Sequence, residues 1–336
     1  MNILVVRLGA LGDIVHTIPA IAALRSALPD VRVDWIVEAK NADIVQMVAG
    51  VNRVLAMDGR SFRDWTAAVH VLRAGAYDAA LDFQGLMKSA LLARVSGARK
   101  VAGFSIWHLR EKGARPFYSD TDDAGAGVHV IRKNLSLLRV LGIDTDRIEF
   151  PLVRVHSDAC ARVLQDSGGR PFALINPGAA WPNKRWPAAR FGEVAAFLHE
   201  VRGMRPVVLW GPGEAELARE VVAASGGVAI EAPPTRVPDI IELARGAALV
   251  LSGDTGPLHL AAAAGAPIVA LMGPTDPGRN GPWSPDDVVV SRFDRCDCHY
   301  ERRCHQSDWC LATVTTAEVT AAIQQRLSRP RASAPA

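Results

Sequence analysis

The chain has 336 residues, of which 49% are hydrophobic and 22% are charged, and its formal net charge is +3. This composition excludes a largely disordered chain, and the length predicts two domains of roughly 100–200 residues each. The net charge is too small to indicate a nucleic-acid-binding protein, so no nucleic-acid partner is expected.

The charge is divided unevenly along the chain. Residues 1–155 contain 20 Lys and Arg against 16 Asp and Glu, a net charge of +4, and the remainder contains 18 against 19, a net charge of −1. Between Lys88 and Arg115 there are seven basic residues and one acid, Glu111. Such a cluster is either a binding surface for an acidic partner or an ordinary solvated face.

Two stretches bear on targeting and membrane insertion. Residues 1–12 are strand-like, and Asp13 comes too early for the apolar region of a cleavable signal peptide. Residues 255–275 contain no Asp, Glu, Lys or Arg, which is long enough for a membrane helix. Gly265, Ala266 and Pro267 divide this stretch, which predicts a short helix followed by a buried strand. A soluble chain is therefore expected.

The first half alternates apolar runs with amphipathic stretches. Because the apolar runs are not interrupted by polar residues, they predict strands that are covered on both faces, as in a parallel α/β sheet. The predicted strands are 3–7, 31–37, 51–56, 79–82 and 99–103, and the predicted helices are 13–28, 65–74, 86–95 and 128–141. Residues 103–127, rich in glycine, charge and aromatic side chains, are predicted to form a loop.

A second α/β unit follows a linker with one helix in residues 151–171. Its predicted strands are 172–176, 206–210, 248–252 and 268–271, and its predicted helices are 187–202, 214–225, 237–245, 256–264 and 316–327. The predicted fold class is therefore α/β, with two Rossmann-like, doubly wound domains. Ligands of such folds bind beyond the carboxyl ends of the strands, so the loops after strands are the candidate sites.

The loop after the first strand ends in an acid. Residues 7–13 (Arg-Leu-Gly-Ala-Leu-Gly-Asp) match neither the dinucleotide fingerprint nor a P-loop. Asp13 is either the N-cap of the following helix or a general base that takes a proton from an acceptor hydroxyl.

Two further loops place charged groups after strands of the second half. Lys184 and Arg185, within residues 176–186, could clamp an anionic group, or they belong to a surface turn. Glu214 follows the next strand. Its carboxylate could accept hydrogen bonds from a ribose diol, or it could stabilise the start of the helix.

Residues 252–259 (Ser-Gly-Asp-Thr-Gly-Pro-Leu-His) run from a strand into a helix. The free amide groups at such a helix start bind phosphate readily. Asp254, Thr255 and Gly256 are therefore predicted to hold a phosphate group. His259 is either part of this site or a core histidine bound to the backbone.

The chain resembles the bacterial ADP-heptose:lipopolysaccharide heptosyltransferases of glycosyltransferase family 9, and heptosyltransferase II in particular. The resemblance extends from Ile3 to about Leu327 and rests on residues 3–13, 176–186, 254–259 and 273–277 in this order. It implies the GT-B fold, with two Rossmann-like domains facing across a cleft. The expected domains are residues 1–155 for the acceptor, residues 156–312 for the nucleotide sugar, and residues 313–336, whose helix would pack back on the first domain.

The resemblance also implies an inverting transfer of L-glycero-D-manno-heptose from ADP-heptose to the Kdo/heptose inner core of lipopolysaccharide, without a catalytic metal. By this resemblance Asp13 would be the catalytic base. The implied donor-binding residues are Lys184, Arg185, Glu214, Asp254, Thr255, Gly256 and His259. Domain closure would bring the two sets together, because they belong to different domains.

The acceptor would be a Kdo-lipid A type glycolipid, which carries carboxylates and phosphates. The basic residues Arg60, Arg63, Lys88 and Arg94 of the first half, together with the segment 110–115, are therefore predicted to bind it. The implied location is cytoplasmic, peripheral at the inner face of the cytoplasmic membrane. Neither the acceptor hydroxyl nor the choice between first and second heptosyl addition follows from the sequence.

Four of the five cysteines, Cys296, Cys298, Cys304 and Cys310, lie within fifteen residues. Their spacing fits no standard zinc finger. Four soft ligands on one short loop could hold a structural Zn or Fe ion, or they could be reduced thiols or form a disulfide during purification. Heptosyltransferase II-like members of the family carry a similar cysteine-rich loop. By this resemblance, the second heptosyl addition is favoured over the first.

Two other functions remain open. One is another nucleotide-sugar-dependent glycosyltransferase, or an epimerase, with the same fold. The other is a non-catalytic nucleotide-sugar binding protein. Replacing Asp13 by alanine distinguishes them, because it should abolish transfer while leaving ADP binding intact.

Overall fold

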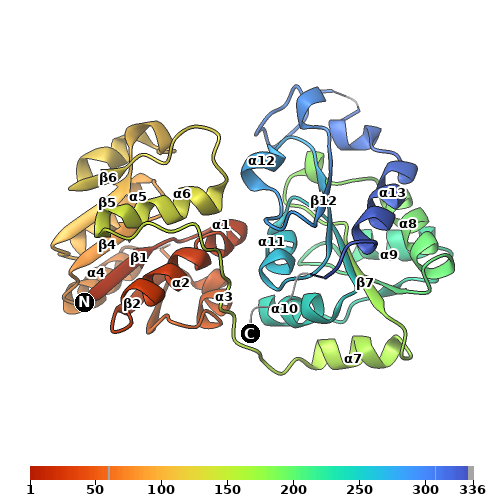
Figure 1. Cartoon of the computed structure of the whole chain (residues 1–336), viewed down its shortest axis with the longest axis horizontal. Coiled ribbons are helices and arrows are strands. Elements are labelled where there is room, and N and C mark those ends of the chain that lie inside the picture. The colour runs from red at the N-terminus through yellow and green to blue at the C-terminus, as the bar shows by residue number, and fades with distance from the viewer. Residues whose placement is uncertain (60, 307, 332–336) are drawn as a thin grey trace. The chain divides into compact units, whose positions relative to one another are not determined.

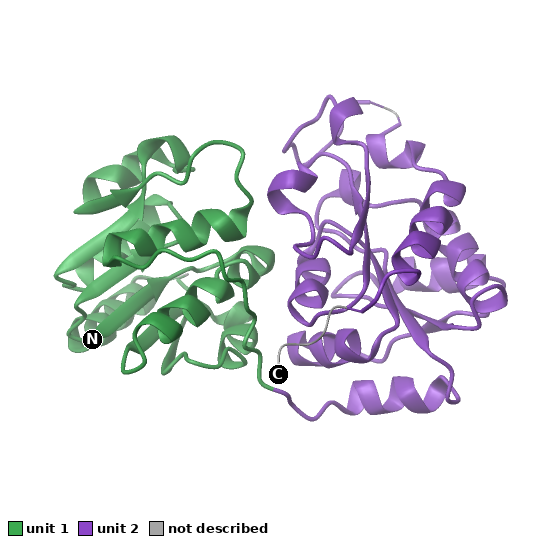
Figure 2. Cartoon of the chain, viewed as in Figure 1, with its two compact units in different colours: residues 1–153 green, residues 154–336 purple. Residues whose placement is uncertain are grey.

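The computed structural model describes residues 1–59, 61–306 and 308–331 (Figure 1). The chain forms two compact units, unit 1 with residues 1–153 and unit 2 with residues 154–336 (Figure 2). The predicted boundary follows residue 155, in the same connection. Among the described residues, no helix is long and apolar enough to cross a membrane.

Unit 1 is built on a parallel sheet with the strand order β3-β2-β1-β4-β5-β6. The strands are β1 (Asn2–Val6), β2 (Arg32–Glu38), β3 (Arg53–Met57), β4 (Ala79–Asp82), β5 (Lys100–Phe104) and β6 (Asp120–Asp122). Four consecutive residues of the central strand β1, from Ile3 to Val6, are fully buried. Burial on both faces explains why this strand reads as an uninterrupted apolar run.

The helices of unit 1 depart from the prediction at one proline. They are α1 (Leu11–Val15), α2 (Ile18–Ala27), α3 (Ala42–Gln46), α4 (Phe62–Ala74), α5 (Met87–Val95) and α6 (Val130–Ser136), with 3-10 turns η1 (Ala39–Asn41), η2 (Ile106–His108), η3 (Lys112–Phe117) and η4 (Leu137–Leu141). The single helix predicted over 13–28 is two helices. Pro19 lies in the first turn of α2 and has no amide hydrogen to continue α1.

The predicted loop 103–127 contains more structure than expected. It holds η2, η3 and the edge strand β6, which pairs with β5 through Ala102 and Asp120. The three residues of β6 are Asp-Thr-Asp. A polar strand of this length has no hydrophobic pattern, so the sequence could not predict it.

Unit 2 repeats this architecture with the strand order β12-β11-β10-β7-β8-β9, also parallel. The strands are β7 (Phe172–Asn176), β8 (Arg205–Val208), β9 (Ile230–Glu231), β10 (Leu249–Gly253), β11 (Ile268–Met272) and β12 (Val288–Ser291). The central strands β7, β10 and β11 are buried along their whole length. The two outer strands β9 and β12 were not predicted.

The helices of unit 2 are α7 (Asp158–Asp166), α8 (Ala188–Glu200), α9 (Ala215–Ala224), α10 (Val237–Gly246), α11 (Gly256–Ala263), α12 (Pro277–Asn280) and α13 (Thr316–Leu327), with 3-10 turns η5 (Pro182–Lys184), η6 (Phe293–Arg295) and η7 (Cys310–Thr313). The uncharged residues 255–275 form α11 and β11, as predicted from the break at Gly265.

The last helix, α13, is part of unit 2 and packs on its core. It lies beside α8 and β12 (Figure 1). Val319 and Ile323 on its buried face join the core of unit 2. The Arg326 guanidinium also pairs with Asp287 at 3.0 Å, and both side chains are almost fully buried. Packing within unit 2 therefore uses the apolar face of α13.

Candidate active site

In unit 2, the ends of two neighbouring strands meet at one loop. Strand β10 is followed by Asp254 and Thr255, and α11 begins directly after them. The neighbouring strand β7 ends at Asn176. The Asn176 amide donates to the hydroxyl of Ser252 at 3.0 Å and to that of Thr255 at 2.9 Å. The loop before α11 is thus fixed from the adjacent strand.

Asp254 is the centre of a buried polar cluster. Its Oδ2 accepts hydrogen bonds from Lys184 Nζ at 2.5 Å and from the Thr275 hydroxyl at 2.6 Å, and its Oδ1 lies 3.2 Å from His259 Nε2. Burial by itself would raise the pKa of Asp254. The hydrogen bond and charge of His259, together with the charge of Lys184, outweigh burial and hold this pKa well below its usual range. Asp254 is therefore an ionised group within this cluster.

Lys184 is held in place from several sides. Its Nζ lies 4.3 Å from the centre of the Trp181 ring, in a cation–π contact, while it pairs with Asp254. A Cβ atom at Gly253 would lie 2.9 Å from the Lys184 carbonyl oxygen, so only glycine fits there without a backbone shift. This close approach explains the glycine before Asp254, and it brings the predicted basic clamp to the predicted phosphate loop.

The start of α11 provides hydrogen-bond donors beside this cluster. Thr255 is the N-cap residue and is extended, with φ −145° and ψ 171°. The first amide groups of a helix have no partner within the helix, and the helix dipole favours an anion there. Thr255, Gly256 and Lys184 together can therefore bind a phosphate. His259 is buried, and its Nε2 lies 3.2 Å from the Asp254 side chain.

Glu214 and Arg185 also lie close together. Glu214 is the N-cap residue of α9, and its Oε2 accepts from the Gly211 amide at 3.0 Å. Arg185 lies 3.9 Å from Glu214 Oε1 and donates through Nε to the Ala179 carbonyl at 2.8 Å. A Cβ atom at Gly178 would collide with Glu214 Oε2, so a larger residue there would displace the Glu214 carboxylate from this position.

In unit 1, Asp13 lies at the third position of α1, and Ala10 is the N-cap residue. Asp13 Oδ2 pairs with Arg7 at 2.7 Å and accepts from the Ala10 amide at 3.3 Å. Arg7 is buried and also donates to the Phe83 carbonyl. The Asp13 side chain is 39% exposed, and its Oδ1 makes no hydrogen bond with a described residue. Asp13 is therefore oriented through one oxygen while the other is open to a ligand.

Two residues that support this loop were missed in the sequence. The Leu8 amide donates to Gln84 Oε1 at 2.6 Å, and Asn41 Nδ2 donates to the Leu8 carbonyl at 3.1 Å. Gln84 follows β4 and Asn41 follows β2, and these strands flank β1. Their positions directly after strands could have identified them in the sequence, because residues that follow neighbouring parallel strands meet at one edge of the sheet.

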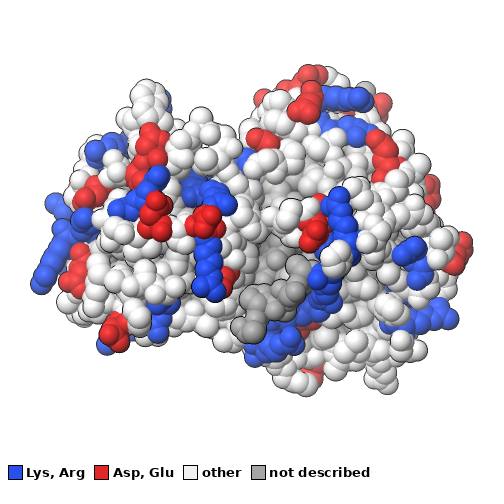
Figure 3. Space-filling view, viewed as in Figure 1, with Lys and Arg blue, Asp and Glu red and all other residues white. Residues whose placement is uncertain are grey.

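The structure does not gather the predicted acceptor-binding residues into one pocket. Arg60 lies outside the described residues. Arg63 is exposed on α4, and Lys88 and Arg94 are exposed on α5. Lys88 pairs with Glu38 at 3.0 Å. Burial alone would raise the pKa of Glu38, but its ion pairs with two lysines lower it. On the face drawn in Figure 3, basic and acidic side chains are interspersed on both units.

The four clustered cysteines are free thiols, and the predicted metal site has no support in the structure. Cys298 and Cys304 form one pair, with 3.1 Å between their sulfur atoms. Burial, together with a hydrogen bond to Cys296, raises the pKa of the Cys310 thiol to about 12. Within the part of the chain that the structure describes, no group of three or more His, Cys, Asp or Glu side chains could hold a metal ion.

The cysteine loop instead packs on the loops of the candidate site. Trp309 Nε1 donates to the Arg185 carbonyl at 2.7 Å, and Asn183 Nδ2 donates to the Glu301 carbonyl at 3.0 Å. A Cβ atom at Gly273 would lie 2.8 Å from the Cys310 sulfur. Trp309 and Asn183 were missed, and these contacts indicate that the cysteine loop supports the segment that carries Lys184.

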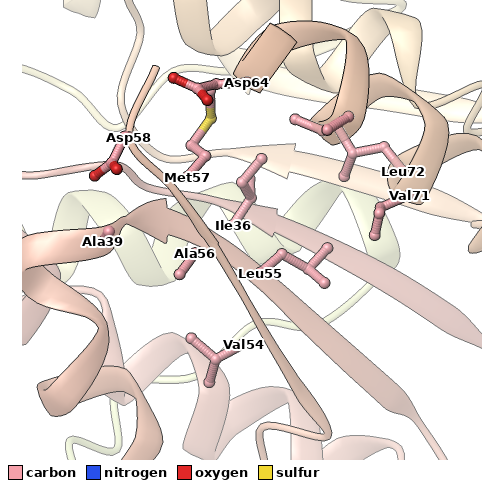
Figure 4. Close-up of a pocket in the computed structure, with 12 residues that line it drawn as sticks. Ile36, Ala39, Val54, Leu55, Ala56, Met57, Asp58, Asp64, Val71 and Leu72 are labelled. Carbon is pink, nitrogen blue, oxygen red and sulfur yellow. The ribbon is translucent and has the colours of Figure 1, made fainter. Parts of the chain in front are cut away.

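A separate cavity of about 450 Å³ lies in unit 1 between β3 and α4 (Figure 4). Its lining is mostly apolar, with Asp58 and Asp64 at one end. The described lining residues are Ile36, Ala39, Val54, Leu55, Ala56, Met57, Asp58, Asp64, Ala67, Ala68, Val71 and Leu72. They include none of the predicted site residues, so this cavity is distinct from the Asp13 loop.

Comparison with known families gives one match over most of the chain. Residues 65–309 match the family described as glycosyltransferase family 9 (heptosyltransferase). Lipopolysaccharide heptosyltransferase 1 of Pseudomonas aeruginosa is 31% identical over 318 residues, which cover 90% of this chain and 87% of that protein. Lipopolysaccharide heptosyltransferase 1 of Escherichia coli K12 is 29% identical, over 86% of this chain and 93% of that protein.

Solved structures give the same result for the fold. The E. coli heptosyltransferase WaaC with ADP superposes with a TM-score of 0.78 at 25% identity, covering 97% of this chain and all of that one. The structure of E. coli ADP-heptose lps heptosyltransferase II gives a TM-score of 0.78 at 23% identity, covering 98% and 99% of the two chains. The predicted GT-B class, with two parallel α/β units, is confirmed.

Proposed function

Because the chain belongs to glycosyltransferase family 9, the heptosyltransferase family, we propose that it transfers heptose from ADP-heptose to the inner core of lipopolysaccharide. The observation that carries this proposal is the Lys184–Asp254–Thr255 cluster at the start of α11, in a chain 31% identical to a lipopolysaccharide heptosyltransferase 1. The cluster supplies what a nucleotide diphosphate requires, namely a cation and free amide groups at a helix start.

In this proposal unit 2 binds the donor. The Lys184 ammonium and the amides of Thr255 and Gly256 bind the diphosphate and stabilise the charge that develops on it as ADP leaves. Asp254 does not contact phosphate, because its carboxylate is negative and is already bound to Lys184 and His259. Its role is to position Lys184. Glu214 binds the ribose through the oxygen that faces Arg185.

Unit 1 supplies the base. Asp13 Oδ1 takes the proton of an acceptor hydroxyl while Arg7 holds Oδ2. The hydroxyl oxygen forms a bond to the anomeric carbon, the bond from that carbon to the diphosphate oxygen breaks, and ADP leaves with the electron pair. Attack from the face opposite the diphosphate inverts the anomeric centre.

The acceptor is a Kdo-lipid A type glycolipid, bound through its anionic groups by Arg63, Lys88 and Arg94, with Arg60 as a further contact. Such an acceptor is anchored in a bilayer. The protein therefore works in the cytoplasm, peripherally at the inner face of the cytoplasmic membrane. The two relatives reported above carry the name heptosyltransferase 1, whereas the cysteine loop favours the second addition.

Release of ADP tests the proposal. Purified protein with ADP-heptose should release ADP with Kdo-lipid A, or with the same acceptor carrying one heptose, and the preferred acceptor identifies the addition. Asp13→Ala should lower kcat by at least about 100-fold while the Kd for ADP stays within about twofold, because in this proposal Asp13 contacts the acceptor hydroxyl and no part of ADP. Asp43→Ala, which removes an acid from α3, is the matched control. Unchanged turnover in Asp13→Ala would exclude this residue as the base.

A further inference from the structure

Unit 1 exposes large apolar side chains on two segments, helix α5 and the 3-10 turn η2. Trp107 is 80% exposed, and Met87, Leu91 and Ile106 are each more than a third exposed. Exposed single apolar residues are common, but a tryptophan exposed to this degree beside three further large apolar side chains is not. We name this set, together with Arg94, Arg110 and Lys112, the α5–η3 surface.

The two segments of the α5–η3 surface are joined by direct contacts. The Met87 amide at the start of α5 donates to Glu111 Oε2 at 2.7 Å. A Cβ atom at Gly113 would lie 2.7 Å from the Met87 sulfur, so η3 passes close over this end of the helix. Leu91 lies one helical turn after Met87 and therefore on the same side of α5. The 3-10 turn with Ile106 and Trp107 contacts η3 directly.

The charge of this surface is positive. Arg94, Arg110 and Lys112 are exposed and make no ion pair with any residue that the structure describes. Two acids lie near these cations, and both are engaged: Glu111 accepts from the Met87 amide, and Asp123 is bound to His108 at 2.7 Å. The surface therefore offers unneutralised cations around exposed apolar side chains.

We propose that the α5–η3 surface docks on an anionic lipid bilayer, an inference that rests on the proposed function for its lipid-anchored acceptor. Tryptophan prefers the boundary between headgroups and acyl chains, where its ring is buried and its N–H remains hydrated. Ile106, Met87 and Leu91 add apolar area to the same boundary. Arg94, Arg110 and Lys112 meet the negative surface potential of the bilayer. Charge complementarity thus selects a bilayer over a neutral apolar partner.

Vesicle binding tests the proposal. The full-length protein is mixed with phosphatidylcholine vesicles and with vesicles that also contain phosphatidylglycerol, and the bound fraction is measured by flotation. Binding is expected only to the anionic vesicles, and it should weaken as salt is raised to about 500 mM. The Ile106→Ser/Trp107→Ser variant should bind about tenfold more weakly, because it loses the inserted side chains. Leu164→Ser/Val201→Ser, which removes exposed apolar side chains of unit 2, should bind like the parent protein.

Three results would overturn the proposal. One is unchanged vesicle binding by the Ile106→Ser/Trp107→Ser variant. Another is loss of binding in Phe62→Ser instead, since Phe62 is the exposed aromatic residue of α4. The third is a change of oligomeric state in the Ile106→Ser/Trp107→Ser variant without vesicles, which would make the surface an interface between copies of the chain.

Turnover separates this proposal from the proposed function. The Ile106→Ser/Trp107→Ser variant should release ADP more slowly with Kdo-lipid A in anionic vesicles, but at the parent rate with a water-soluble acceptor that lacks acyl chains. Equal loss with both acceptors would show that these residues do not act through the bilayer. If neither acceptor supports ADP release by the parent protein, the proposed function fails, while vesicle binding still tests the surface.

Discussion

At the scale of single residues, the candidate site depends on which oxygen of a carboxylate is already occupied. Asp254 and Asp13 both follow a central strand, and the sequence predicted a direct ligand role for each. Asp254 is bound on both oxygens by Lys184, Thr275 and His259. Asp13 is bound on one oxygen by Arg7. This difference is the basis for the proposed roles, Asp254 as a positioning residue and Asp13 as the base.

Replacing Asp254 by asparagine tests the positioning role. Asp254→Asn breaks a buried ion pair, so the free energy of unfolding should fall by about 3 kcal/mol. Because Lys184 loses the group that orients it, the Kd for ADP should rise at least about tenfold, as measured by calorimetry. Asp276→Asn, in the N-cap of α12, is the matched control and should leave the Kd unchanged.

A fall in stability with an unchanged Kd for ADP would mean that Asp254 supports the fold alone. Should Asp254→Asn fail to fold, Thr275→Val gives a milder test. It removes one hydrogen bond to Asp254 Oδ2 and keeps the ion pair with Lys184. A smaller rise in the Kd for ADP is then expected.

At the scale of elements, α13 is fastened to unit 2 at both ends. At its start, Thr315 is the N-cap residue and Glu318 accepts from its amide and hydroxyl. Arg292 binds the same carboxylate through both oxygens at 2.7 Å. At its end, Arg326 pairs with Asp287. Arg292 and Asp287 lie 26 and 39 residues before their partners on α13, so the sequence predicted the helix but not these contacts.

The start of α13 makes stability depend on pH. The hydrogen bonds from Arg292 and the Thr315 amide lower the pKa of Glu318 to about 2. Since the folded pKa lies below that of the unfolded chain, the stabilisation is present above about pH 4.5 and is lost as the pH falls towards 2. Glu318→Gln should therefore lower the free energy of unfolding by about 1 kcal/mol at pH 7, since the group is partly exposed. In urea unfolding, its difference from the parent protein should disappear near pH 2.

Glu200→Gln is the control for this measurement, because Glu200 makes no ion pair with any residue in the described ranges. Its effect on unfolding should be small at every pH. A Glu318→Gln variant whose deficit stays constant from pH 7 to pH 2 would contradict the argument, since the loss would then not come from the carboxylate charge.

At the scale of the whole molecule, the two units have different charges and different proposed ligands. Residues 1–153 of unit 1 contain 19 Lys and Arg against 16 Asp and Glu, a net charge of +3, and residues 154–336 of unit 2 contain 19 against 19, a net charge of zero. Unit 1 presents its cations at the surface, as on α5 and η3, whereas Lys184 of unit 2 is largely buried. Salt screens exposed charges much more than buried ones. The two substrates should therefore respond differently to ionic strength.

Kinetics at two salt concentrations test this difference. Between about 50 and 500 mM NaCl, the KM for the anionic acceptor should rise about fivefold, while that for ADP-heptose should rise less than about twofold. Lys88→Gln/Arg94→Gln should raise the acceptor KM at low salt and reduce its salt dependence. Arg202→Gln, in unit 2, serves as the control. Equal salt dependence of both KM values would contradict this assignment of charge to the acceptor.

The sequence by itself determined the elements whose side chains are buried on both faces. Apolar runs predicted β1, β7, β10 and β11, and the order of motifs predicted the family and placed Lys184, Asp254 and Thr255 in loops after strands. The sequence did not predict elements that lack a hydrophobic pattern of their own. The strands β6, β9 and β12 are short or lie at sheet edges, and Pro19 divides a helix that the hydrophobic pattern joins.

Only the tertiary structure decided how the loops combine. It placed Asp254 against Lys184, Gln84 and Asn41 around Leu8, and Trp309 against the Arg185 carbonyl, over separations of about 30 to 120 residues. It also separated the cysteines into pairs and assigned α13 to unit 2. The reason is physical: parallel strands are joined by crossovers, so residues distant in the chain become neighbours at one sheet edge. Spacing in the sequence indicates which residues follow strands, but the strand order decides which of them meet.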